Sequence, residues 1–123
     1  MEFTERLKKN SDFVKVYRKG KSRANHQVVL YIMKNGTEVN RLGISVSKKV
    51  GNSVIRHRAK RLIKEAYRLN ERKFEKGYDL VFIARSGVRD RTFAEIEKSL
   101  LHISALQGVL SIGEIHTSQG TEQ

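Results

Sequence analysis

The sequence predicts one small α+β domain. Its 123 residues suit a single compact unit, and 38% hydrophobic residues are enough for one modest core. Short β-prone apolar runs alternate with stretches in which apolar residues recur at helical spacing. Between residues 42 and 84 the order is strand, helix, strand, which is typical of a βαβ unit with a parallel pair.

The first predicted helix begins at Asn10, takes Asn10 or Ser11 as its N-cap, and ends before Gly20. Phe13 and Tyr17 lie four residues apart on it, with Lys and Arg residues around them. Two aromatic rings on a short helix commonly belong to a core. Rings among bases can equally offer stacking surfaces for unpaired nucleobases, and the residues alone leave both interpretations open.

Residues 21–34 are predicted to be extended, and their apolar second half indicates a buried strand. In this strand Tyr31 lies on the opposite face from Leu30. Asn35-Gly36 then signals a turn.

The next predicted strand covers residues 42–47, where apolar side chains alternate with Gly43, Ser45 and Ser47. One face is therefore buried and the other carries only small side chains. Such a face can admit a ligand close to the sheet, or it can pack closely against a helix. A further strand is predicted at residues 78–84.

The central predicted helix, residues 51–69, carries the most unusual charge pattern in the chain. Its apolar stripe comprises Ile55, Ala59, Leu62, Ile63, Ala66 and Leu69. Its basic ridge comprises Arg56, Lys60, Lys64 and Arg68, with His57 and Arg61 beside it, while Arg58 lies on the other flank of the stripe. A solvated face normally mixes both signs of charge. Like charges at this spacing destabilise a helix, so the ridge favours a polyanionic partner.

The last predicted helix covers residues 92–107, where Thr92 and Glu95 form a capping box. Its buried stripe comprises Phe93, Ile96, Leu100, Ile103 and Leu106. We predict a single RNA-binding domain over residues 1–112. The polar residues 113–123 are predicted to form a disordered tail.

A formal net charge of +12 and a pI near 10.2 restrict the class of partner. Nucleic acid and anionic membrane both fit such a charge, but no apolar run is long enough to span a bilayer. The first residues resemble no signal peptide, and there is no Cys for disulfides or thiolate metal sites. We therefore expect a cytoplasmic protein that does not bind membranes.

The chain shows no catalytic constellation of its own. The four His residues have no metal-ligand spacing, the carboxylates are scattered, and no phosphate-binding glycine motif is present. We expect no catalytic residue and no protein-bound metal. Two rival functions stay open: a general RNA-binding or ribosome-associated protein, and a self-contained metal-dependent nuclease.

One long run carries a specific resemblance. The segment RLGISVSKKVGNSVIRHRAKRLIKEAYR resembles the signature of the bacterial ribonuclease P protein subunit, and SDFVKVYRKGKSRANHQVVLY resembles the first helix and strands of that family. The similarity covers about residues 7–106. It implies an α-β-β-β-α-β-α two-layer sandwich with a left-handed βαβ crossover, like the second domain of ribosomal protein S5. That hand runs against the usual rule for such connections.

The resemblance also implies a function. Proteins of this family join a catalytic RNA, and the complex removes the 5′ leader of precursor tRNA. The RNA holds the catalytic Mg²⁺ ions, so a protein active site is not expected. We expect a monomeric protein, one per ribonuclease P RNA, with precursor tRNA as the second partner.

Residue by residue, the resemblance implies two surfaces. The catalytic RNA would contact the central helix through Arg56, His57, Arg58, Lys60, Arg61, Lys64 and Arg68. The leader-binding cleft would use Phe13, Tyr17, Tyr31, Ser45, Ser47, Lys48 and Asn52. At one position the chain departs from the family, since His57 stands where the motif has Asn. Its larger ring changes the hydrogen-bonding geometry, and its protonated form would favour phosphate at lower pH.

Overall fold

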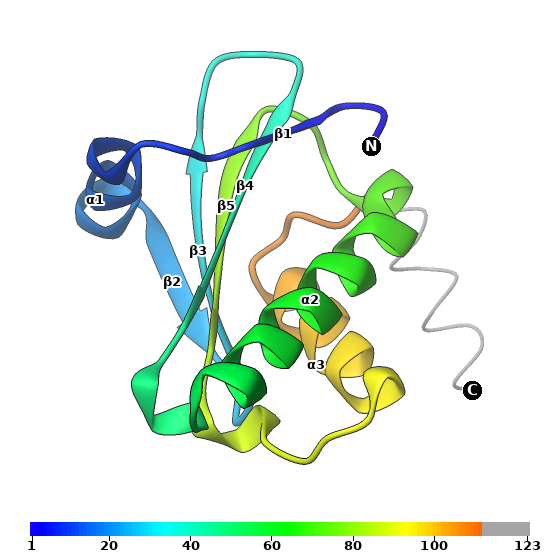
Figure 1. The fold of residues 1–123 in the computed structure, drawn as a ribbon. Helices are drawn as coiled ribbons and strands as arrows, with labels where there is room; N and C mark the ends of the chain where they lie inside the picture. The colour runs from blue at the N-terminus through cyan, green and yellow to red at the C-terminus, as the bar shows by residue number, and fades with distance from the viewer. Residues whose placement is uncertain (112–123) are drawn as a thin grey trace, which may run out of the picture.

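A five-stranded mixed sheet organises the molecule, with the strand order β1-β4-β5-β3-β2 (Figure 1). The structure is a computed structural model, and it describes residues 1–111. The strands are β1 (Thr4–Arg6), β2 (Lys21–Ala24), β3 (Val28–Lys34), β4 (Asn40–Val46) and β5 (Tyr78–Ala84). The helices are α1 (Asn10–Lys19), α2 (Ser53–Asn70) and α3 (Phe93–Leu106). Short 3₁₀ turns lie at Lys48–Val50, Glu71–Lys73 and Ser86–Val88. The α+β class is confirmed, as are the two strands and the turn expected between residues 28 and 47.

The helices divide unequally between the two faces of the sheet. Helices α2 and α3 cover one face, and α1 lies against the other (Figure 1). The main core, which includes Leu30, Ile63 and Phe82, fills the space under α2 and α3. A smaller cluster of Leu7, Val16 and Val81 lies under α1. Each face of the sheet therefore has its own apolar cluster, and α1 packs on the smaller of the two clusters.

Helix α2 connects β4 to β5, which are adjacent and parallel. Arg41 pairs with Asp79 at one end of the ladder and Val46 pairs with Ala84 at the other. The predicted βαβ unit with a parallel pair is thus confirmed. The hand of this crossover stays a prediction.

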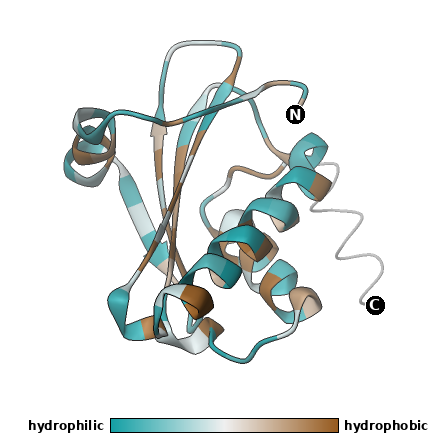
Figure 2. Cartoon of the chain, in the orientation of Figure 1, coloured by the Kyte–Doolittle hydropathy of each residue, from teal (hydrophilic) through white to brown (hydrophobic). Residues whose placement is uncertain are grey.

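The buried stripe of α2 differs from the predicted one at its C-terminal end. Ala59, Ile63 and Ala66 are buried as expected, but Leu69 is exposed and Tyr67 is fully buried in its place. The Tyr67 hydroxyl lies 2.9 Å from the Thr4 hydroxyl and accepts a hydrogen bond from Asn40 Nδ2. Burial of Tyr67 is therefore explained by polar partners from the sheet edge, which helical spacing alone does not reveal. In Figure 2 most of the ribbon of α2 is coloured as hydrophilic, with hydrophobic segments between.

The ends of the helices test the capping predictions. The capping box of α3 is confirmed, since Thr92 Oγ1 accepts from the Glu95 N–H and the Glu95 carboxylate accepts from the Thr92 N–H. The N-cap predicted for α1 is wrong, because Lys9 precedes the helix and supplies no side-chain cap. Leu106, predicted to be buried, is exposed at the end of α3. The predicted tail, residues 113–123, lies outside the described residues.

The N-terminal segment forms an element that the sequence did not predict. Strand β1 pairs in parallel with the first half of β4, so β4 is not an edge strand between Asn40 and Leu42. The buried carboxylate of Glu71 accepts hydrogen bonds from the main-chain N–H groups of Glu2 and Phe3. The segment is therefore attached to the end of α2 as well as to the sheet.

Candidate nucleic-acid interface

Three aromatic side chains meet where α1 packs on the sheet. The ring centroids of Tyr17 and Tyr31 lie 5.1 Å apart in an edge-to-face arrangement, and those of Phe13 and Tyr17 lie 6.4 Å apart. Phe13 and Tyr31 are half-buried, while Tyr17 is more exposed. The residues left the interpretation open between core and stacking surface. In the structure the rings differ in exposure. Phe13 mainly packs α1 against the sheet, and Tyr17 has the most accessible ring of the three.

Gly43 explains why Phe13 can lie so close to β4. A Cβ atom at Gly43 would lie 2.6 Å from the Phe13 ring and 3.2 Å from Leu7 Cδ2, so any side chain there would force the ring to move. The small-residue face of β4 therefore admits a helical side chain at Gly43. Two residues further along, Ser45 is left beside Tyr17 rather than beneath Phe13.

The Tyr17 hydroxyl responds to this environment. Burial raises the pKa of Tyr17 above its ordinary value, while a side-chain hydrogen bond with Ser45 opposes the shift. Tyr17 is consequently neutral at physiological pH. A neutral phenol beside Ser45 presents one donor and one acceptor next to an aromatic face.

The other predicted cleft residues follow the end of β4. Ser47 Oγ accepts a hydrogen bond from the Lys49 N–H, and Asn52 Oδ1 accepts one from the Ile55 N–H at the start of α2. Lys48 is exposed in the turn between them. These side chains lie on the segment that joins β4 to α2, and the hydroxyl of Ser47 and the amide N–H groups of Asn52 keep their capacity to donate.

The basic ridge of α2 faces outward as predicted. His57, Lys60, Arg61 and Lys64 are exposed. Two members of the predicted set differ from the rest in their contacts. Arg68 forms an ion pair with Glu65, so its charge is partly compensated. Arg58 donates to the main-chain carbonyl of Arg91 and therefore lies on the α3 side of the helix.

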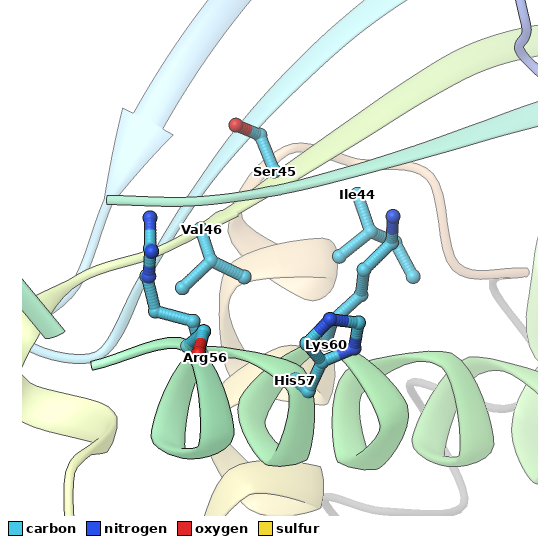
Figure 3. Close-up of a pocket in the computed structure, with 7 residues that line it drawn as sticks. Ile44, Ser45, Val46, Arg56, His57 and Lys60 are labelled. Atoms are coloured by element: carbon cyan, nitrogen blue, oxygen red, sulfur yellow. The ribbon is translucent and has the colours of Figure 1, made fainter. Parts of the chain in front are cut away.

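Arg56 occupies a special position on the ridge. Its side chain extends from the first turn of α2 toward the end of β4 (Figure 3). The Arg56 Nε is buried, and within residues 1–111 it has no hydrogen-bond partner. A buried donor without a partner costs free energy, and this atom has no exposed surface in the present position of the side chain.

A pocket of about 390 Å³ separates the start of α2 from β4. Figure 3 shows Ile44 and Val46 pointing toward the helix, while Ser45 points to the opposite face of the strand. Arg56, His57 and Lys60 line the helical side of this pocket. The ridge and the aromatic group thus lie on opposite faces of the sheet, and β4 separates them.

Among residues 1–111 no three His, Asp or Glu side chains come together as a possible metal site. No helix in the same range is both long and apolar enough to cross a membrane.

Comparisons with known proteins agree on one family. A family profile described as Ribonuclease P matches residues 1–106. The ribonuclease P protein component of Alkaliphilus metalliredigens is 54% identical over 103 residues, which are 84% of this chain and 93% of that protein.

Solved structures give the same result. The Staphylococcus aureus RNase P protein is 41% identical with a TM-score of 0.79, over 86% of this chain and 97% of that one. The Thermotoga maritima RNase P protein is 34% identical with a TM-score of 0.74, over 80% and 93% of the two chains.

Proposed function

Because the chain belongs to the family of ribonuclease P protein components, we propose that it binds the catalytic RNA of ribonuclease P and the 5′ leader of precursor tRNA. In this complex the protein assists the endonucleolytic removal of the leader, and the RNA performs the chemistry with its own Mg²⁺ ions. The observation that carries the proposal is the single-sign ridge of α2 beside an accessible aromatic group across β4.

The ridge is proposed to bind the catalytic RNA. Lys60, Arg61 and Lys64 are exposed, and no ion pair within residues 1–111 compensates them. Cationic side chains that neutralise phosphates release counterions, so this contact should dominate affinity and depend strongly on salt. Arg56, a half-buried member of the ridge, would add the charge of its guanidinium to the contact with phosphate.

The aromatic group is proposed to bind the leader. A single-stranded leader can place a base on the accessible face of Tyr17, close to Ser45, because stacking needs no particular sequence. Ser47, Lys48 and Asn52 would contact the backbone of the leader as it passes toward α2. Such a site favours the precursor over the mature tRNA, which has no leader to stack.

A cleavage assay tests this function directly. Precursor tRNA is incubated with the protein alone, with a ribonuclease P RNA alone, and with both, at limiting Mg²⁺. We expect faster cleavage only when both are present, since the positive charge lowers the Mg²⁺ needed to fold and load the RNA. Cleavage by the protein alone would identify a nuclease. If the protein does not raise the cleavage rate of the RNA, only general RNA binding is left as its function.

A further inference from the structure

A second hollow, of about 690 Å³, lies at the outer edge of β4, at the point where β1 leaves the sheet. The N-terminal segment forms one wall, α2 forms the other through Lys60 and Lys64, and β4 forms the base between Leu42 and Ile44. Tyr17 and Tyr31 do not line it, but Phe13 does, so the hollow borders the aromatic group at that ring.

The lining combines an apolar base with a basic rim. Leu7 and Leu42 are buried, and Phe13 and Ile44 are half-buried. The rim carries four exposed bases and one acid: Arg6, Lys8, Lys60, Lys64 and Glu5. An apolar surface surrounded by an excess of positive charge suits a ligand with a flat ring and a phosphate.

The main chain of β4 adds hydrogen-bonding capacity at this place. Leu42 accepts a hydrogen bond from the Leu7 N–H, and the β1–β4 ladder ends there. The N–H and C=O groups of successive residues in a strand point to opposite edges. Ile44, two residues after Leu42, therefore points its N–H and C=O to the same edge as Leu42, the edge that faces β1. No strand within residues 1–111 pairs with that edge beyond Leu42. One donor and one acceptor are therefore available side by side at the base of the hollow.

The wall opposite α2 is held in place. Glu71 accepts from the Glu2 N–H at 2.9 Å and from the Phe3 N–H at 3.2 Å. The Phe3 ring also lies under the Lys76 ammonium, 5.0 Å from the ring centroid. The hollow therefore has a fixed shape before any ligand binds, which reduces the entropic cost of binding.

We propose that this hollow binds one unpaired nucleotide of the RNA partner. The base lies against Leu42 and Ile44 on the α2 side of β4 and hydrogen-bonds to the main chain of Ile44, while its phosphate contacts Lys60 and Lys64. The inference rests on the proposed function, since it places one extruded nucleotide at the side of the basic ridge. A peptide strand would also fit an open sheet edge, but the excess of four bases over one acid favours RNA.

Methyl NMR of the full-length protein tests the site with a simple probe. The methyl groups of Leu7, Leu42 and Ile44 report on the base of the hollow, and those of Leu30 and Leu100 in the main core serve as controls. Adenosine monophosphate should shift the first three signals, and inorganic phosphate at the same concentration should not. Equal shifts with both ligands, or shifts confined to the methyl groups of Val16 and Ile83, which belong to the cluster around Phe13 and Tyr31, would overturn the proposal.

A pair of variants extends the test to RNA. Ile44→Ala should weaken binding of a single-stranded RNA pentamer about fivefold without changing the salt dependence, because it removes a base contact and no charge. Leu101→Ala, which trims another half-buried side chain on the main core, is the matched control and should leave binding unchanged. Equal effects of both variants would show that the substitutions disturb folding. In that case the methyl NMR spectra of the wild-type protein with adenosine monophosphate decide whether the nucleotide site exists.

The two proposals can fail separately. If the protein accelerates ribonuclease P RNA but adenosine monophosphate does not shift the three methyl signals, the nucleotide site is wrong and the function stands. If the methyl signals shift but a β-strand peptide displaces the nucleotide more effectively than the RNA pentamer does, the partner is a peptide and the inference is wrong.

Discussion

The ring of Phe13 occupies the space that a side chain at residue 43 would need. A Cβ atom at Gly43 would lie 2.6 Å from Cε1 and 2.7 Å from Cζ of that ring. The position of α1 over the sheet, and with it the distance between Tyr17 and Tyr31, therefore depends on the absence of one methyl group in β4.

The variant Gly43→Ala should destabilise the protein by about 1–3 kcal/mol, the usual cost of overpacking. In a Phe13→Ala background the same substitution should cost much less, because the ring that it meets is gone. Urea unfolding of both single variants and the double variant gives the coupling free energy. Additive effects would show that the contact does not position α1.

Tyr17→Ala should reduce the preference for leader-bearing over leaderless tRNA by about fivefold or more, since one stacked base is worth about 1–3 kcal/mol. Tyr17→Phe should keep most of the preference because the ring is retained. Val14→Ala, on an exposed position of the same helix, is the control. Binding of the two tRNA forms to the assembled complex is the measurement, and a change in melting temperature alone would place Tyr17 in the core.

The ridge prediction concerns the salt dependence of assembly. Lys60→Ala combined with Arg61→Ala should weaken binding to ribonuclease P RNA and lower the slope of log K against log salt by about 1.5, because two phosphate contacts are lost. Lys98→Ala combined with Arg89→Ala removes two exposed charges elsewhere and should change the slope little. An unchanged slope in the ridge variant would contradict the proposed contact.

Glu71 should make the attachment of the N-terminal segment depend on pH. Burial alone would raise the pKa of Glu71, but hydrogen bonds from Thr4 and from the N–H groups of Glu2 and Phe3 hold the pKa below its ordinary value of 4.5. A carboxylate with a lowered pKa in the folded state stabilises the fold above the pKa of the unfolded state. That contribution is lost as pH falls through the folded value.

Glu71→Gln removes the charge at every pH. We expect the variant to be less stable than the wild type at pH 7, with the difference shrinking below about pH 4, as the wild-type carboxylate becomes protonated. Glu75→Gln, at a neighbouring exposed position, is the control. Unfolding midpoints measured between pH 3 and pH 7 provide the comparison, and a constant difference would exclude the linkage.

The sequence predicted the elements whose signals are local. The bounds of α1 and β5 agree with the structure because Gly20 ends the helix and a dense β-prone run defines the strand. Strand β1 was not predictable, since Thr4–Arg6 is a polar three-residue segment. Its strand partner is the segment Asn40–Leu42, and the Thr4 hydroxyl contacts Tyr67, 63 residues further along the chain, so no local signal marks it.

The candidate site divides in the same way. Helical spacing alone located the exposed ridge from Arg56 to Lys64, because charge and periodicity are both visible in the residues. The aromatic group needed the resemblance, since spacing could not decide between core and stacking. Two features could not be predicted from the sequence, because they arise where separate elements meet. They are the contact between the Phe13 ring and Gly43, and the hollow beside β1.

The position of β5 has a consequence for synthesis of the chain. It lies between β4 and β3, yet among residues 1–111 it is the last strand to be made. Neither β3 nor β4 can pair with its main sheet partner until residue 84 has left the ribosome, so both halves of the sheet expose unpaired edges until then. We therefore expect nascent chains that end before Tyr78 to lack the central sheet, and the whole sheet to close in one late step.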